Sequence, residues 1–121
     1  MIGIGVDLVD VHRFRTVLQR RAQISERLIT KNELSYCNSA TDPTERLAAR
    51  FAAKEAVMKA LGTGIRGVPW KSIEVYRPRG KAPKIRLYGN AKRKAEELGI
   101  NEIAISISHS RNYAVASVVA Q

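Results

Sequence analysis

The stretch TERLAARFAAKEAVMKAL, residues 44–61, is the longest helical pattern in the chain, and the other segments can be arranged around it. Asp42 and Pro43 precede it as an N-cap acceptor and a proline for the first helical position, and Gly62 can supply the left-handed residue that ends the helix. At about 100° per residue, bulky side chains form one stripe and six alanines cover much of the remaining surface. The stripe consists of Leu47, Phe51, Met58 and Leu61. This pattern predicts a long helix that is buried on most sides.

Charged side chains interrupt this apolar helix at four positions, which are Arg50, Lys54, Glu55 and Lys59. Removing an ion from water costs on the order of several kcal/mol in real proteins, so a buried charge needs an opposite charge, a metal ion or a ligand phosphate beside it. For Glu55 and Lys59, four residues apart with the glutamate first, an ordinary helix-stabilising pair is the alternative. The helix is therefore expected to carry either a binding site or internal ion pairs.

The sequence on both sides of this helix contains further strand and helix patterns. The expected strands are residues 2–9, 73–76, 85–88, 103–107 and 113–119, and the further helices follow Asp10, start at a Thr30–Glu33 capping box, and span 90–98. The last two strands are expected to pair as a hairpin across residues 110–112. Together these elements predict a single α+β domain over residues 1–121.

The charge of the chain is unusual, because 21 Lys and Arg residues stand against 11 Asp and Glu in 121 residues, for a net charge of +10. Such a balance favours an acidic partner, which nucleic acid, an anionic membrane, a phosphate-rich molecule or an acidic protein could each provide. The one cysteine, Cys37, excludes an internal disulfide and a cysteine-rich zinc site. Asp7 and Asp10 interrupt the apolar N-terminal segment, and no apolar run approaches the roughly 20 residues that span a bilayer. A cytoplasmic protein without membrane contact is expected.

Two further positions are candidates for chemistry. Asp10 can cap the first helix, which leaves Asp7 without a structural task. Asp7 and Glu55 are a suitable ligand pair for Mg²⁺, which takes one or two protein carboxylates together with substrate phosphates. His109 lies between serines in the expected hairpin turn, where it is either a solvated turn residue or a donor to phosphate. The chain lacks the nucleophile elbow of a Ser-His-Asp hydrolase.

Three segments of the chain together resemble the signatures of the 4′-phosphopantetheinyl transferases. They are Gly5-Val6-Asp7, Phe51-Ala52-Ala53-Lys54-Glu55-Ala56 with Lys59 and Gly62-Thr63-Gly64, and Ser106-Ile107-Ser108-His109-Ser110. The similarity runs through the whole chain, and it is closest to the small bacterial holo-acyl-carrier-protein synthases. The apolar Val9 supports the small type, because larger, two-lobed members carry a further acidic metal ligand two residues after the aspartate. The resemblance implies a small antiparallel sheet packed against a long central helix, in a homotrimer whose active sites lie between subunits.

The resemblance also implies an activity, which is Mg²⁺-dependent transfer of the 4′-phosphopantetheine group from coenzyme A to a serine of apo acyl carrier protein in support of fatty-acid biosynthesis. It implies that Asp7 and Glu55 bind Mg²⁺ and that Lys59 pairs with the pyrophosphate, these three residues being the catalytic set. Glu55, or a water on the metal, is the expected base for the attacking serine. The residues expected to bind coenzyme A are Arg50 and His109, with Arg46, Gly62 and Gly64 beside them.

Because acyl carrier proteins are acidic, arginines of the first helix are expected to bind the carrier. These are Arg13, Arg20 and Arg21, which lie away from the apolar stripe of that helix. A nucleic-acid-binding module is the competing class, since residues 75–95 contain eight basic residues and no acidic one. Aromatic residues are only 6% of the chain and form no stacking platform, so we favour a solvated basic face there and expect no nucleic-acid partner.

Overall fold

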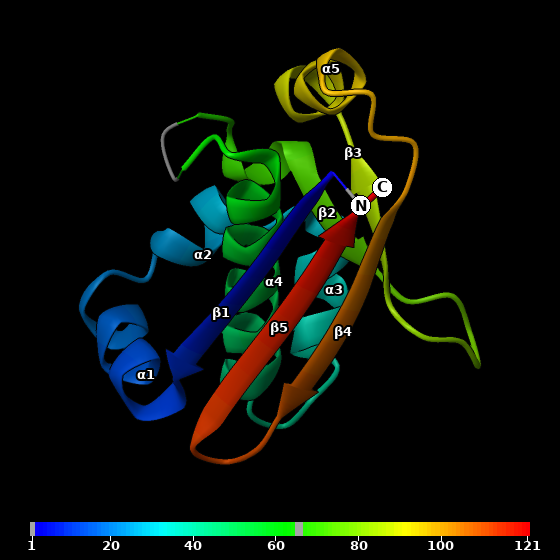
Figure 1. The fold of residues 1–121 in the computed structure, drawn as a ribbon. Coiled ribbons are helices and arrows are strands. Elements are labelled where there is room, and N and C mark those ends of the chain that lie inside the picture. The colour runs from blue at the N-terminus through cyan, green and yellow to red at the C-terminus, as the bar shows by residue number, and fades with distance from the viewer. Residues whose placement is uncertain (1, 65–66) are drawn as a thin grey trace.

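The computed structural model describes residues 2–64 and 67–121. Three antiparallel strands form one sheet in the order β1–β5–β4, and helix α4 lies against one face of it (Figure 1). These elements are β1 (Gly3–Asp10), β4 (Ile103–His109), β5 (Tyr113–Ala120) and α4 (Thr44–Leu61). The expected packing of a small antiparallel sheet against a long central helix is confirmed. Within the described ranges, no helix is both long and apolar enough to cross a bilayer.

The remaining elements cover the other sides of α4 and its ends (Figure 1). They are α1 (Val11–Arg20), α2 (Ile24–Leu28), α3 (Lys31–Asn38), the 3₁₀ helix η1 (Trp70–Ser72), β2 (Ile73–Tyr76), β3 (Lys84–Leu87) and α5 (Gly89–Glu97). Strands β2 and β3 form a separate two-stranded antiparallel sheet. The expected strands and helices lie within one or two residues of these bounds, whereas α2 and η1 were not expected.

The helix caps largely follow the sequence signals. Asp10 accepts a hydrogen bond from the backbone N–H of Arg13, and Thr30 and Glu33 form the expected capping box. Asp42 accepts from the N–H of Thr44 at 3.0 Å. Helix α4 spans Thr44–Leu61, and Pro43 directly before it already has helical backbone angles and accepts from the N–H of Leu47 at 2.9 Å, as expected for a proline at the start of the helix.

Strand β1 packs unusually close to helix α4. A Cβ atom added at Gly3 would overlap the carbonyl oxygen of Ala60, and one added at Gly5 would overlap that of Ala56. Glycine on the strand and alanine on the helix therefore let the two backbones approach each other directly. This close approach fixes the position of the next inward-facing residue of β1, Asp7, against α4.

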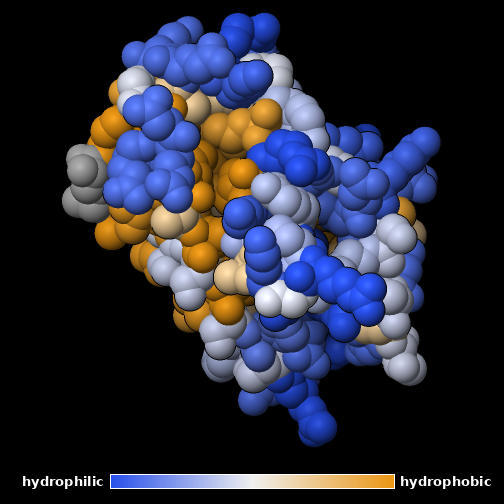
Figure 2. All heavy atoms as spheres, turned by 90° about the vertical axis from the view of Figure 1, so that its right-hand side faces the viewer, coloured by the Kyte–Doolittle hydropathy of each residue, from blue (hydrophilic) through white to orange (hydrophobic). Residues whose placement is uncertain are grey.

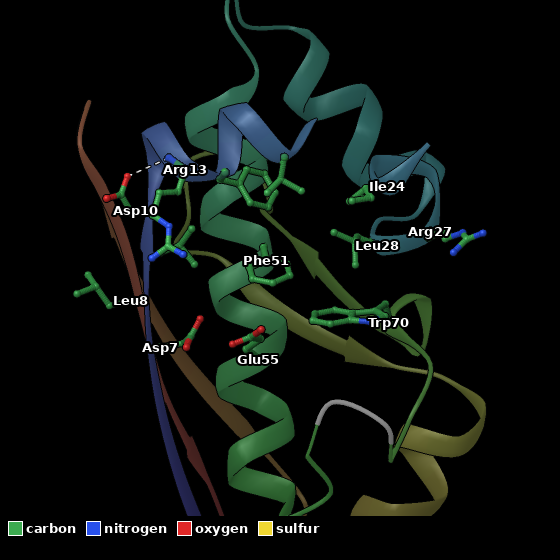
Figure 3. Close-up of a pocket in the computed structure, with 13 residues that line it drawn as sticks. Asp7, Leu8, Asp10, Arg13, Ile24, Arg27, Leu28, Phe51, Glu55 and Trp70 are labelled. Carbon is green, nitrogen blue, oxygen red and sulfur yellow. Dashed lines mark hydrogen bonds between the residues drawn. The ribbon is translucent and has the colours of Figure 1, made fainter. Parts of the chain in front are cut away.

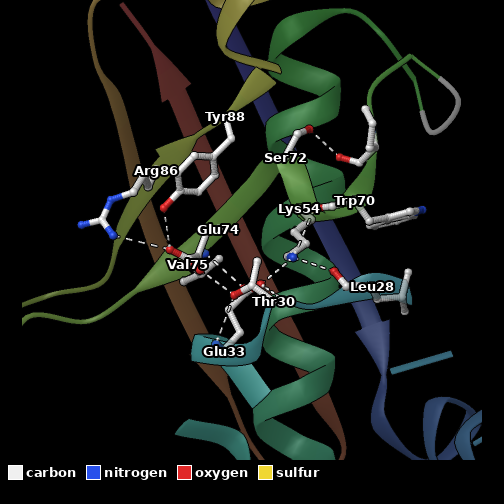
Figure 4. Close-up of polar contacts among 11 residues, drawn as sticks. Leu28, Thr30, Glu33, Lys54, Trp70, Ser72, Glu74, Val75, Arg86 and Tyr88 are labelled. Atoms are coloured by element: carbon white, nitrogen blue, oxygen red, sulfur yellow. Dashed lines mark hydrogen bonds and ion pairs between the residues drawn. The ribbon is translucent and has the colours of Figure 1, made fainter. Parts of the chain in front are cut away.

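One charge of α4 is fully buried and is paired, as the burial argument required. Lys54 is 0% exposed, and its Nζ lies 2.6 Å from Oε1 of Glu33, which is 1% exposed (Figure 4). Lys54 also donates to the carbonyl oxygens of Leu28 and Trp70, while Glu33 accepts from the N–H of Val75 at 3.1 Å. Burial lowers the pKa of Lys54 from its ordinary value, and the Glu33 carboxylate opposes this effect. The pair ties α4 to α3, η1 and β2, so it has a structural role.

The face of the sheet that points away from α4 is apolar and open. Alternate residues of β1 are strongly exposed on it: Ile4, Val6 and Leu8 are 63%, 57% and 63% exposed, and Tyr113 of β5 is 52% exposed. Figure 2 looks from the right-hand side of Figure 1, so this face forms its left-hand side, where hydrophobic side chains gather. Contiguous exposed apolar surface of this kind is typical of a protein interface.

Candidate active site

Asp7, Glu55 and Lys59 form a cluster where β1 crosses α4. Asp7 points from the strand toward the helix, and Glu55 points toward it from one turn of α4 (Figure 3). Lys59 Nζ lies 3.3 Å from Oδ1 of Asp7 and donates to the carbonyl oxygen of Val6 at 2.9 Å. The ion pair of Lys59 is thus with Asp7, and not with Glu55 as in the simple helix-pair alternative. The structure brings the three residues of the expected catalytic set together.

The electrostatics of this cluster suit a divalent cation. Asp7 is largely buried, and in the part of the chain that the structure describes its Oδ2 has no hydrogen-bond partner. Burial and the nearby negative charge of Asp7 raise the pKa of Glu55 to about 7. Two carboxylates that repel each other and an unused buried acceptor fit Mg²⁺, which completes its shell with water and substrate oxygens. The described residues contain no cluster of three or more potential ligands, so a cation here would depend on those additional oxygens.

The coupling between these carboxylates gives a prediction for pH. Without a cation, folding raises the pKa of Glu55 from 4.5 to about 7, so the folded chain holds an extra proton between these values. The stability due to that proton is complete below the lower pKa and is lost as the pH rises through the upper one. Mg²⁺ can relieve the repulsion that remains, and it competes with the proton. We therefore expect Mg²⁺ to raise the melting temperature more at about pH 8 than at about pH 6.

Differential scanning fluorimetry with and without Mg²⁺ checks this expectation, with Ca²⁺-free buffers and matched ionic strength. Glu55→Gln is the control, because it removes both the titrating proton and one cation ligand. An increase in melting temperature that is equal at the two pH values, or that persists in Glu55→Gln, contradicts a cation bound by these carboxylates.

A groove of about 640 Å³ opens beside the carboxylates, between β1, α1, α2, α4 and η1 (Figure 3). Its lining is mainly apolar, and it includes Phe14, Val17, Ile24, Leu28, Phe51 and Trp70. Phe51 stacks on Trp70 with ring centroids 5.1 Å apart, so two packed aromatic rings form part of the lining of the groove. Arg13 and Arg27 also line it. The groove therefore combines apolar surface, positive charge and a pair of carboxylates.

A second cluster lies on another flank of α4, around Arg50 and His109. Arg50 and Glu55 are five residues apart, which separates them by about 140° around a helix. A small cleft of about 140 Å³ is lined by Arg50, His109, Tyr36 and Arg77, among others. His109 Nδ1 lies 3.1 Å from Oε1 of Glu45. Within one chain, the structure therefore does not bring the Arg50 cleft to the Asp7–Glu55–Lys59 cluster.

The other predicted coenzyme A residues lie near the ends of α4. Arg46 donates to the carbonyl oxygen of Tyr36 at 2.9 Å and to Oγ of Ser39 at 2.8 Å, so its guanidinium already has partners in α3 and the following turn. Gly62, with a φ angle of 72°, ends α4 with left-handed backbone as expected, and Gly64, with a φ angle of 66°, lies in the loop that follows. Among the described residues, and apart from each glycine's own chain neighbours, no atom lies within 4 Å of where a Cβ would stand at either position.

Of the arginines expected to bind a carrier, Arg13 lines the groove, and Arg20 and Arg21 are exposed at the end of α1. Sequence reasoning missed Tyr36 and Arg77 as members of the second cluster. For Arg77, the basic run of residues 75–95 was a signal, but nothing in the sequence distinguished one of its members from the others. For Tyr36, the sequence contained no signal.

Comparison with known proteins identifies the class. A model of the 4′-phosphopantetheinyl transferase superfamily matches residues 3–118. The chain therefore belongs to the 4′-phosphopantetheinyl transferase superfamily, as its three motifs implied. Within that superfamily it groups with the holo-[acyl-carrier-protein] synthases, which confirms the predicted enzyme class.

Two relatives and two solved structures illustrate the similarity. The holo-[acyl-carrier-protein] synthase of Koribacter versatilis is 45% identical over 121 residues, covering 98% of this chain and 97% of its own. That of Moorella thermoacetica is 41% identical over 116 residues, covering 96% and 91%. The structure of the enzyme from Neisseria meningitidis has a TM-score of 0.92 at 35% identity, covering 100% of this chain and 98% of its own. The Helicobacter pylori enzyme in complex with coenzyme A has a TM-score of 0.86 at 32% identity, covering 98% and 99%.

Proposed function

We propose that Asp7, Glu55 and Lys59 are the catalytic centre at which this chain transfers 4′-phosphopantetheine from coenzyme A to a serine of apo acyl carrier protein. The observation that carries the proposal is the buried Oδ2 of Asp7, which has no hydrogen-bond partner among residues 2–64 and 67–121 and lies near a second carboxylate at the edge of an open groove. The complex of the Helicobacter pylori enzyme with coenzyme A supports the same co-substrate here.

In this reaction the serine oxygen bonds to the phosphorus that carries the pantetheine arm, and the bond from that phosphorus to the bridging oxygen breaks. Adenosine 3′,5′-bisphosphate leaves with the bridging oxygen. Asp7 and Glu55 would hold Mg²⁺, which when bound neutralises charge on the pyrophosphate. Lys59, half exposed beside Asp7, provides a second positive charge for the leaving oxygens. Glu55, or a water held on the metal, would accept the serine proton.

We infer that three copies assemble and that each active site joins two of them. Two observations support this: the catalytic cluster and the Arg50 cleft lie on different flanks of α4, and the outer face of the sheet exposes Ile4, Val6 and Leu8. Association through this apolar face would cover it and would let Arg50 and His109 of one copy approach the carboxylates of another. We also propose that the enzyme acts in the cytoplasm, together with its carrier.

We propose that the groove and the arginines of α1 dock the carrier, because their positive charge complements an acidic protein. We expect Arg13→Glu to raise the Michaelis constant for the carrier by about tenfold at low salt, with a smaller effect as salt increases. The Michaelis constant for coenzyme A should stay unchanged. Lys92→Glu, which reverses a charge on α5 outside the groove, is the matched control. Equal effects of the two reversals would refute docking at this groove.

The transfer itself is tested by incubating the protein with coenzyme A, Mg²⁺ and an apo acyl carrier protein, followed by intact-mass analysis. The carrier should gain one phosphopantetheine group, and a chelator should abolish the gain. If the mass of the carrier does not change in the presence of Mg²⁺ and coenzyme A, the proposed function is contradicted.

A further inference from the structure

We propose that Arg77, on the loop between β2 and β3, is a further anion-binding residue of the Arg50–His109 cleft and contacts a phosphate of coenzyme A. This inference rests on the function proposed above. It gives one member of the basic run 75–95 a specific task, whereas the sequence alone favoured a solvated face for all of that run.

The cleft has an excess of positive charge and an unused donor. Arg50 is 6% exposed, and among the described residues its Nε has no hydrogen-bond partner. Its guanidinium lies 4.2 Å from the centroid of the Tyr36 ring, which holds it in place without neutralising it. Arg77 lines the same cleft, and no carboxylate is among the lining residues that the structure describes. The carboxylate of Glu45 lies beside His109, and among the described residues it forms no ion pair with either arginine. The two guanidinium groups are therefore suited to an anion.

Arg77 is also held in a way that leaves its binding groups available. Its Nε donates to the carbonyl oxygen of Lys81 at 3.1 Å, across the loop. Within the described part of the chain its terminal nitrogens make no hydrogen bond, and the residue is exposed. A guanidinium fixed through Nε presents its two terminal nitrogens as a planar fork, which matches two phosphate oxygens. Arg50 and Arg77 therefore approach the cleft from different elements, α4 and the β2–β3 loop.

The test compares Arg77→Gln with Arg79→Gln, which removes the same charge two residues further along the same loop but outside the cleft. Arg50→Gln is the reference for loss of the cleft. Isothermal titration calorimetry measures the dissociation constants of coenzyme A and of adenosine 3′,5′-bisphosphate for the assembled protein. We expect Arg77→Gln to weaken both by about tenfold, which corresponds to one charge-assisted contact, and Arg79→Gln to leave them unchanged.

Dephospho-coenzyme A distinguishes the possible phosphates. If the loss in Arg77→Gln disappears with this analogue, the contact is to the 3′-phosphate; if the loss persists, it is to the pyrophosphate; either result supports the proposal. If Arg50→Gln weakens binding and Arg77→Gln behaves like Arg79→Gln, the role of Arg77 is overturned while the proposed function stands. If neither Arg50→Gln nor Arg77→Gln weakens binding, the cleft is not the nucleotide site, and the assignment of Arg50 is overturned with it.

Discussion

Replacing Glu55 by glutamine is expected to reduce phosphopantetheine transfer by on the order of 10²- to 10⁴-fold, because it removes both a cation ligand and the proton acceptor. The fold should survive, since Glu55 faces Asp7 across a repulsive contact that glutamine relieves. Without Mg²⁺ at about pH 8, where Glu55 is ionised, the variant should melt at the same or a higher temperature than the wild type. Intact-mass measurement of the carrier over time gives the rate, and calorimetry gives the stability.

The matched control is Glu97→Gln, which removes one carboxylate from an exposed position at the end of α5. It should transfer at the wild-type rate. A Glu55→Gln variant that transfers as fast as this control would remove Glu55 from the catalytic set. A variant that has lost activity together with its fold would contradict the claim that the two carboxylates repel each other.

The second large effect is expected at Lys54, which lies one residue before Glu55 and has a different role. Lys54→Met should lower the free energy of unfolding by about 3–5 kcal/mol, because it leaves the carboxylate of Glu33 buried without its cation. Urea unfolding monitored by circular dichroism measures this loss. Lys71→Met, at an exposed position of η1, is the control and should change the free energy of unfolding by less than about 0.5 kcal/mol.

A double variant separates loss of the pair from loss of packing. Glu33→Gln keeps an acceptor for the N–H of Val75 while removing the negative charge, so adding it to Lys54→Met should recover part of the lost stability. If Lys54→Met alone costs as little as Lys71→Met, the buried pair does not have the structural role assigned to it.

Much of the fold could be predicted from local signals in the sequence. The Asp10 cap, the Thr30–Glu33 capping box and the left-handed Gly62 each act within three or four residues, so the chain itself specifies them. The elements α2 and η1 were missed because five and three residues are too few to show a helical period. Their positions depend on contacts with distant parts of the chain.

The motifs in the sequence predicted which residues form the candidate site. How those residues are arranged in space depends on the topology of the fold and could not be predicted. The resemblance of the motifs grouped Asp7, Glu55 and Lys59, which the structure places side by side. The need for a partner at Lys54 followed from its place in an apolar helix. Its partner, Glu33, is 21 residues away in the sequence, and no local pattern identifies Glu33 as that partner. The separation of the Arg50 cleft from the carboxylates likewise became visible only once both flanks of α4 were in place.

The claim that one active site is made from two copies can be tested by mixing two defective variants. Glu55→Gln and Arg50→Gln are co-expressed with different affinity tags, and assemblies that contain both are isolated by two successive purifications. Transfer to an apo acyl carrier protein at low coenzyme A concentration is then followed by intact mass. We expect the mixed assemblies to regain transfer that neither variant shows alone, because one interface joins an intact Glu55 to an intact Arg50. Mixed assemblies that stay as inactive as their parents would contradict a site shared between copies.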